Sequence, residues 1–237
     1  MIARLCLVEL RKLVDTISGA VLIGVAAVLA GVFGGGALLL RPGAPFSEVA
    51  QLAGVPGGTL VVVMAILLVT AEGSHRTALV TYTVTPHRRR VAAAKAVAAA
   101  TLGLLVVVFA VVAATVIVPV GALVTGDVAN WSVETATLAC WAAGTVIGAL
   151  SGWALGLAIG NAPAAIVLVL VWPMMTGMLA NVSALVPVLP WLDSAAVAGF
   201  ADGVDPGDLG RFLSGLAAWV VVPAVVGLVR VTRGEVR

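Results

Sequence analysis

Residues 96–124 read AVAAATLGLLVVVFAVVAATVIVPVGALV, a run without a single Asp, Glu, Lys or Arg. A helix needs about twenty apolar residues to cross a bilayer, so this run is long enough to span one. Five such runs of twenty or more residues, and one of eighteen, can be separated along the chain. Only 10% of the residues are charged, against about a quarter in an ordinary soluble domain. We therefore predict an all-α, polytopic membrane protein.

The charge-free runs predict six transmembrane helices in a single transmembrane domain that covers residues 1–237. The spans are expected at about 17–40, 52–71, 96–124, 136–160, 163–189 and 211–230. Residues 190–210 are expected to form an external segment. The first run follows Arg4, Arg11 and Lys12 as in a signal peptide. It exceeds a typical apolar signal core and lacks a convincing cleavage site, so we expect a retained span.

Lysine and arginine gather on one side of the expected membrane, which predicts the orientation. If the N-terminus is inside, only Arg41 and Arg211 of the 13 Lys and Arg residues lie outside. Both termini are then cytoplasmic, as six spans require. The net charge of +2 hides this asymmetry. The basic residues thus orient the protein, and they give no reason to expect a nucleic-acid partner.

Residues 1–15 precede the first span and carry an amphipathic pattern. Apolar residues recur through the segment, while Arg4, Arg11 and Asp15 fall within a narrow arc at helical spacing. This pattern predicts an amphipathic interfacial helix that lies on the membrane surface in contact with lipid. An ordinary basic flank that only sets the topology is the alternative.

The longest cytoplasmic segment is expected at residues 72–95, between the second and third spans. A short helix would begin near Ser74 and end before Pro86, because proline donates no backbone hydrogen bond and disfavours a helical residue before it. Three arginines at 88–90 then lead into the next helix. Such a segment suits the docking of a soluble partner. A basic run that touches anionic lipid headgroups is an equally weighted alternative.

Five glycines share one face of the fourth span. They recur at every fourth residue, which places them in a nearly continuous stripe along a helix. Another helix can approach a stripe without side chains closely, and small residues at this spacing are typical of helix packing in membranes. The neighbour would come from the same chain or from another. These glycines are Gly144, Gly148, Gly152, Gly156 and Gly160.

Polar residues interrupt the fifth span, which also contains Pro173. Thr176, Asn181 and Ser183 are candidates for a substrate path. Hydrogen bonding between helices is the more frequent role of such residues in membranes, and we weigh it above the first. The proline predicts a kink in this span.

The chain lacks the motifs for chemistry of its own. It has no Gly-rich phosphate loop ending in Gly-Lys-Ser or Gly-Lys-Thr, which an ATPase would need. The centres of the expected spans contain no ionisable side chain, which disfavours an ion-coupled carrier. His75 and His87 form no metal-binding pattern, and no span pairs a serine with a histidine. We expect no catalytic residue, no metal and no enzyme activity, so that a partner must drive any work.

The segment after the second span resembles that of the permease subunits of type-2 ABC exporters, the drug, antibiotic and polysaccharide export class. These permeases commonly show an acid at the end of the second span, then a threonine, a proline with nearby arginine, and a lysine that opens the third span. Arg76 departs from the pattern, since a glycine often precedes the threonine. Residues 8–14, VELRKLV, also resemble the interfacial helix of the family. The matching residues are Glu72, Thr77, Pro86, Arg88 and Lys95.

The resemblance implies a membrane subunit that hydrolyses nothing itself. A coupling helix within residues 72–95 would rest on a separate cytoplasmic ABC ATPase, which binds ATP and Mg²⁺. A second permease, identical or different, would complete a path through the bacterial plasma membrane for a hydrophobic or amphipathic compound, as in multidrug or antibiotic efflux. A stand-alone membrane interaction or immunity protein without transport activity is the alternative. The partner-facing residues would be Glu72, Arg76, Thr77, Pro86, Arg88, Arg89 and Arg90.

Overall fold

The computed structural model describes residues 17–74, 88–192 and 209–233, and every regular element in these ranges is a helix. The long helices are α2 (Ile17–Leu40), α3 (Phe46–Ser74), α5 (Arg88–Thr125), α6 (Thr135–Ile159) and α7 (Ala162–Leu179). A short helix, α8 (Leu189–Leu192), follows. The last stretch combines α10 (Leu209–Leu216), the π-helical turn η2 (Ala217–Val221) and α11 (Val222–Arg233).

Five helices in the described ranges are long and apolar enough to cross a membrane. They cover Phe46–Thr70, Arg89–Thr125, Thr135–Ile159, Ala162–Leu179 and Leu209–Thr232. A further apolar stretch, Gly24–Leu40 of α2, is shorter than these. The prediction of an all-helical chain of polytopic membrane character is therefore confirmed. The count of six spans stays a prediction.

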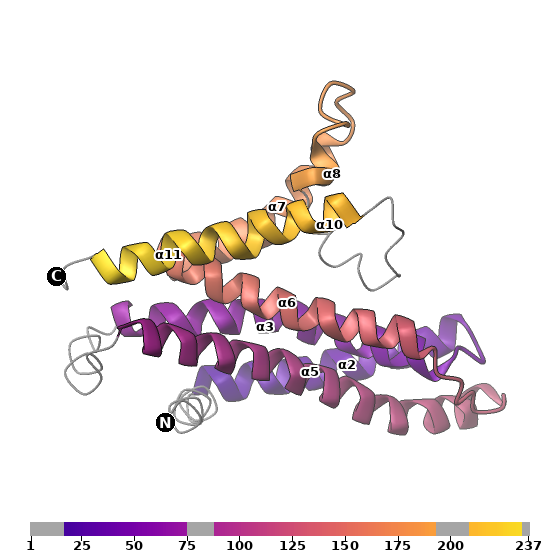
Figure 1. Cartoon of the computed structure of the whole chain (residues 1–237). Coiled ribbons are helices and arrows are strands. Elements are labelled where there is room, and N and C mark those ends of the chain that lie inside the picture. The colour runs from indigo at the N-terminus through magenta and orange to yellow at the C-terminus, as the bar shows by residue number, and fades with distance from the viewer. Residues whose placement is uncertain (1–16, 75–87, 193–208, 234–237) are drawn as a thin grey trace.

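The long helices follow one common axis, which runs from left to right in Figure 1, and successive helices run in opposite directions along it. The end of α3, the start of α5 and the end of α11 lie at one end of the bundle, here called the 74/88 end. The end of α2, the start of α3 and the end of α5 lie at the opposite end. In the described residues, Arg89, Arg90 and Arg230 belong to the 74/88 end, whereas Arg41 follows α2 and Arg211 lies in α10.

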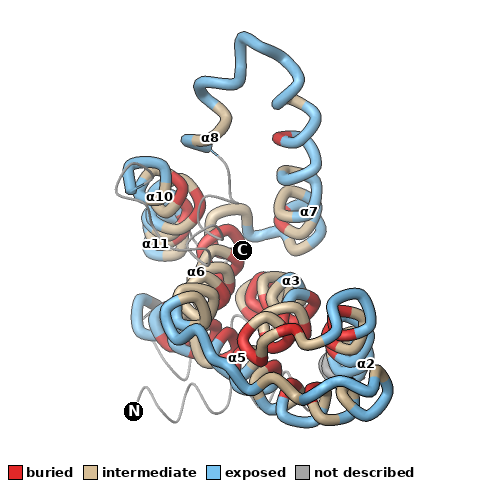
Figure 2. Tube along the Cα trace, turned by 90° about the vertical axis from the view of Figure 1, so that its right-hand side faces the viewer, coloured by how far each residue is buried: buried red, intermediate tan, exposed pale blue. Residues whose placement is uncertain are grey.

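The centre of the bundle is formed by α3, α5 and α6, and most of its buried side chains are small. Ala65 of α3, Ala98 of α5 and Ala154 of α6 are fully buried in this region. Small side chains let helix backbones approach closely, and dispersion contacts then hold them together in lipid. Large apolar side chains such as Leu104 and Val112 are exposed on the outside, as a lipid-facing surface requires (Figure 2).

The fifth expected span, 163–189, is wrong at its C-terminal boundary, because α7 ends at Leu179. Residues 180–188 form turns that stand off from the bundle before α8 begins (Figure 1). The Asn181 amide donates a hydrogen bond to the Met178 carbonyl at 3.2 Å, a local bond that competes with helix continuation. Pro187 also lacks a backbone donor. The residues after Leu179 are still mainly apolar, so composition alone could not predict where α7 ends.

Two helices begin before the spans that were expected for them. The helix α3 begins at Phe46, ahead of the expected span 52–71, and α5 begins at Arg88, ahead of the expected span 96–124. The early start of α3 places Glu48 in its first turn, where Arg41 Nη1 contacts Glu48 Oε1 at 2.9 Å. The expected interfacial helix at 1–15 lies outside the described residues. So does 193–208, most of the expected external segment.

Candidate functional site

The predicted partner-facing residues fall at the 74/88 end, and the structure describes part of the set. Arg76, Thr77 and Pro86 lie outside the described residues. The backbone places Glu72 in α3, close to its end, and Arg88 at the first position of α5. Arg89 and Arg90, which follow, are exposed. The two described arginine side chains thus face away from the helix core, where a partner or lipid headgroups could reach them.

Lys95 lies about two turns after the start of α5, and it is only 3% exposed. Its Nζ donates a hydrogen bond to the Leu68 carbonyl of α3 at 3.0 Å. A buried ammonium is stable only where polar partners replace water, and a charge-assisted bond supplies that. The lysine that the sequence pattern assigns to the opening of a span therefore fastens α5 to α3. Sequence reasoning missed its burial, since a lysine beside three arginines looks like part of a solvated cluster.

Two more side chains at the same end donate to the carbonyls of a neighbouring helix. Trp153 Nε1 of α6 donates to the Ala92 carbonyl of α5 at 3.1 Å. Arg230 Nη1 of α11 donates to the Ala158 and Ile159 carbonyls of α6 at 2.9 and 2.6 Å. Carbonyls at the C-terminus of a helix have no intrahelical donor and carry partial negative charge, so a guanidinium stabilises them.

Together these bonds define a carbonyl clamp, made by Lys95, Trp153 and Arg230. It joins α3 to α5, α5 to α6, and α6 to α11 at the 74/88 end. Gly160 helps to form the last joint, because its φ of 65° ends α6 in a left-handed turn that favours glycine. A Cβ at this position would lie 2.9 Å from Arg230 Nη1, so the guanidinium would have to shift to admit a side chain.

Trp153→Phe should lower stability, because it removes the indole N–H while keeping an aromatic ring. The lost bond to the buried Ala92 carbonyl is worth about 1 kcal/mol. For a chain of this size that corresponds to a fall in Tm of about 2–4 °C. The matched control is Trp131→Phe, because Trp131 is half exposed and stacks on Phe46 at 5.8 Å, a contact that phenylalanine retains. Thermal unfolding of the detergent-purified variants measures both, and equal shifts would contradict the assigned bond.

The glycine stripe of α6 packs on α3 of the same chain. A Cβ built at Gly152 would collide with the Val62 carbonyl oxygen. A Cβ built at Gly156 would lie 3.3 Å from both Cα and O of Ile66. Gly148 is less crowded, at 3.6 Å from Val62 Cγ2. The stripe therefore seats the backbone of α6 directly on α3 over its second half, and it does not continue to Gly160, which caps the helix.

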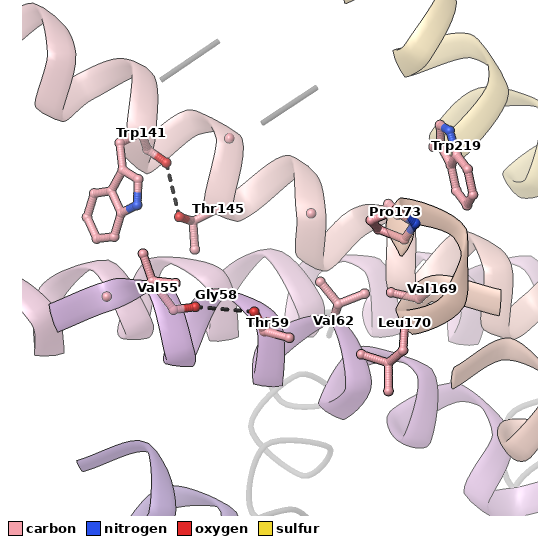
Figure 3. A pocket seen from close by; sticks show the side chains of 14 residues that line it. Val55, Gly58, Thr59, Val62, Trp141, Thr145, Val169, Leu170, Pro173 and Trp219 are labelled. Atoms are coloured by element: carbon pink, nitrogen blue, oxygen red, sulfur yellow. Dashed lines mark hydrogen bonds between the residues drawn. The ribbon is translucent and has the colours of Figure 1, made fainter. Parts of the chain in front are cut away.

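A cavity of about 530 Å³ opens where α3 and α6 diverge, next to α7 and the last helical stretch (Figure 3). Gly54 and Gly58 of α3 and Gly144 and Gly148 of α6 line it, two pairs at the same four-residue spacing. A Cβ at Gly58 would have no neighbour within 4 Å, whereas one at Gly54 would collide with the Trp141 ring, so open space remains at Gly58 and the indole fills the space at Gly54. The other lining residues are Val55, Thr59, Val62, Trp141, Thr145, Ser151, Val169, Leu170, Pro173 and Trp219.

The cavity wall is apolar and uncharged, with hydroxyl groups at two helices. Thr59 Oγ1 donates to the Val55 carbonyl at 3.3 Å, and Thr145 Oγ1 donates to the Trp141 carbonyl at 3.0 Å (Figure 3). The protons of these two hydroxyls are thus used within the helices, and Ser151 adds a third hydroxyl to the lining. The oxygens retain lone pairs, so each hydroxyl can still accept a hydrogen bond.

One side of the cavity is held in place by tryptophans. Trp219, in the π-helical turn η2, lies against Trp172 of α7 with ring centroids 5.5 Å apart. Both indole N–H groups donate to the Leu192 carbonyl, Trp219 at 2.9 Å and Trp172 at 3.3 Å. The end of α8 is thereby tied to both α7 and the last helical stretch. Short π-helical turns occur frequently at functional sites.

The residues predicted for a substrate path do not line this cavity. Thr176 is buried in α7 and donates to the Pro173 carbonyl at 3.0 Å. Asn181 and Ser183 are exposed in the turns after α7. The bonds of Thr176 and Asn181 are therefore local, and neither joins two helices. The sequence did contain a signal for the cavity, because Gly54 and Gly58 in α3 have the same four-residue spacing as Gly144 and Gly148 in α6.

Within residues 17–74, 88–192 and 209–233, no three His, Cys, Asp or Glu side chains gather as metal ligands. Glu48 is paired with Arg41, and Cys140 is a half-buried free thiol. The described part of the chain thus offers two features that could act: the basic 74/88 end and the cavity.

Comparisons with protein-family models, curated proteins and solved structures found no match to this chain.

Proposed function

We propose that the chain is the transmembrane permease subunit of an ATP-driven ABC exporter in a bacterial plasma membrane. A separate cytoplasmic ATPase would dock on residues 72–95 and supply the energy. A second permease, identical or different, would complete the assembly. The exported compound would be hydrophobic or amphipathic. The 74/88 end and both chain termini would face the cytoplasm, with six spans in all.

The observation that carries this proposal is the Lys95 bond to the Leu68 carbonyl, 3.0 Å long. The helices that it joins, α3 and α5, are the two that flank residues 75–87. Force applied to that segment would reach both helices together, because their adjoining ends are fastened to each other. A membrane subunit driven by an external motor needs such a mechanical connection between its docking segment and its spans.

The rest of the carbonyl clamp supports the same mechanism. Trp153 connects α5 to α6, and Arg230 connects α6 to α11. A displacement that starts at α3 and α5 would therefore be passed to α6, which lines the cavity, and to α11, which follows the turn η2 that places Trp219 at the cavity. Arg89 and Arg90 are exposed at the start of α5, where a cationic surface can steer an acidic partner surface into place.

One argument for the alternative, a stand-alone membrane interaction or immunity protein, is weakened by the packing of α6. It used the glycine stripe for assembly with another chain. Gly152 and Gly156 are instead in contact with α3 of the same chain, and Gly160 caps α6. Gly152 and Gly156 are buried in this contact, so neither has a face left for a partner helix. We therefore favour the permease function.

Affinity purification of the tagged chain from its native cells in mild detergent tests the proposal. We expect a P-loop ATPase to copurify in a fixed stoichiometric ratio, and ATP hydrolysis to appear in the eluate. The chain itself, purified after expression alone, should hydrolyse no ATP. Repeated isolation of the intact chain without any ATPase, under conditions that preserve a known exporter complex processed in parallel, would reject the proposed function.

A further inference from the structure

The cavity between α3, α6 and α7 has the size of a small-molecule site. Its volume of about 530 Å³ falls within the range of roughly 300–1,000 Å³ that is typical of ligand pockets. It is partly open, and its lining includes the exposed residues Val55, Thr59 and Leu170. A molecule dissolved in the lipid could enter there without crossing the bundle.

Three oxygens at the cavity can accept a hydrogen bond, and the hydroxyl of Ser151, which also lines it, can donate or accept one. The hydroxyl protons of Thr59 and Thr145 are used on the Val55 and Trp141 carbonyls, which leaves their oxygens as acceptors. Pro173 lacks an N–H, so the carbonyl of Val169, four residues earlier, has no α-helical donor from that position. A molecule with a hydroxyl or N–H group would meet one acceptor on each of three helices, Thr59 on α3, Thr145 on α6 and Val169 on α7.

The cavity also selects against charge. None of its lining residues is Asp, Glu, Lys, Arg or His. A charged molecule buried here would lose its hydration without gaining a counter-charge, which disfavours its binding. A neutral molecule would lose little, since most of the wall is aliphatic and aromatic.

We propose that this cavity binds a neutral, mainly apolar compound that carries a hydroxyl or N–H donor, such as a long-chain or aromatic alcohol. The apolar body would lie against Val62, Leu170 and Trp219. The donor would bond to the Thr145 or Thr59 oxygen or to the Val169 carbonyl. Binding does not depend on an ATPase partner, whereas the identification of this compound as exported cargo rests on the proposed function.

Photolabelling of the purified full-length chain tests the site. The probe is 3-azioctanol, a neutral aliphatic alcohol with a photoreactive diazirine, and labelled residues are mapped by mass spectrometry. We expect saturable labelling of cavity residues, at least fivefold reduced by excess 1-octanol. Octane, which has no donor, and protonated octylamine, which is charged, should compete several-fold less well. Equal competition by octane or octylamine would overturn the proposed selectivity.

Gly58→Leu should fill the cavity and reduce its saturable labelling at least fivefold. The matched control is Gly35→Leu in α2. Both glycines are half buried and helical, and a Cβ at either position has no neighbour within 4 Å, but only Gly58 lines the cavity. Labelling of Gly35→Leu should equal that of the unaltered chain. If both variants label like the unaltered chain, or labelling is non-saturable and spread over lipid-facing residues, the cavity is not a ligand site.

Thr145→Val provides a second variant should Gly58→Leu fail to fold. It keeps the shape of the side chain but removes one of the three acceptor oxygens, so the advantage of octanol over octane should become smaller than in the unaltered chain. Displacement of the probe by added phospholipid but not by octanol would assign the cavity to a lipid chain and overturn the proposal. Loss of labelling with dimer formation would assign it to a second copy, with the same consequence. None of these measurements uses ATP or an ATPase, so failure here is distinct from failure of the proposed function.

Discussion

Gly152→Ala is expected to destabilise the folded chain, whereas Gly148→Ala, one turn earlier on the same face of α6, is expected to be neutral or stabilising. A Cβ at 152 would collide with the Val62 carbonyl oxygen, a backbone atom that cannot rotate away. A Cβ at 148 would rest at 3.6 Å from Val62 Cγ2, an ordinary contact with the end of a side chain. One added methyl group therefore has opposite consequences at two neighbouring positions.

The expected magnitudes separate the two variants clearly. Alanine has a higher helix propensity than glycine by about 1 kcal/mol, and this term favours both substitutions equally. Overpacking against a rigid neighbour costs roughly 1–3 kcal/mol or more, and it applies to Gly152→Ala alone. Thermal unfolding in detergent should show a Tm below that of the unaltered chain for Gly152→Ala and not for Gly148→Ala. Shifts of the same sign and size would mean that α6 is not seated on α3 at Val62.

Hydropathy predicted the positions of the helices far better than it predicted their ends. The first run gave 17–40, and α2 has these bounds. The fifth run gave 163–189, yet α7 ends at Leu179 although the residues after it are still mainly apolar. Apolar composition reports what dissolves in lipid, while a helix also needs continuous backbone bonding. Asn181 and Pro187 interrupt that bonding without lowering the hydropathy of the run much.

The buried contacts between helices and the cavity could not be predicted from the residue pattern of any one helix. The stripe on α6 was visible in the sequence, but its partner, Val62 of α3, was not. The cavity arises because two helices in contact at Gly152 diverge toward Gly144, and because α7 lies beside the gap. Lys95 looked like one more basic residue at a membrane surface, since its burial depends on the neighbouring α3. Each of these features is a property of a pair of helices.

Neutralising Arg89 and Arg90 together, as Arg89→Gln with Arg90→Gln, is expected to reduce the amount of copurified ATPase at least tenfold. This prediction rests on the proposed function. Both side chains are exposed at the start of α5, so the substitutions remove no buried contact and should leave the Tm within about 2 °C of its original value. A tenfold loss corresponds to about 1.4 kcal/mol of binding free energy, a modest demand on two charge-assisted contacts.

The matched control neutralises two arginines near the opposite end, as Arg41→Gln with Arg211→Gln. It removes the same charge from the chain, and Arg41 is likewise exposed, with 75% of its side chain accessible beside Glu48. If residues 72–95 form the docking segment, this control should recover as much ATPase as the unaltered chain. A reporter fused to the C-terminus must show the same orientation in both variants, because arginines also set topology.

Equal losses in the two double variants would show that total charge matters and the basic end of α5 does not. Unchanged recovery in both would place the docking surface away from Arg89 and Arg90. A loss confined to this end that shrinks as salt is raised would show that charge attraction at Arg89 and Arg90 holds the ATPase, because salt screens the attraction that only the unaltered chain makes.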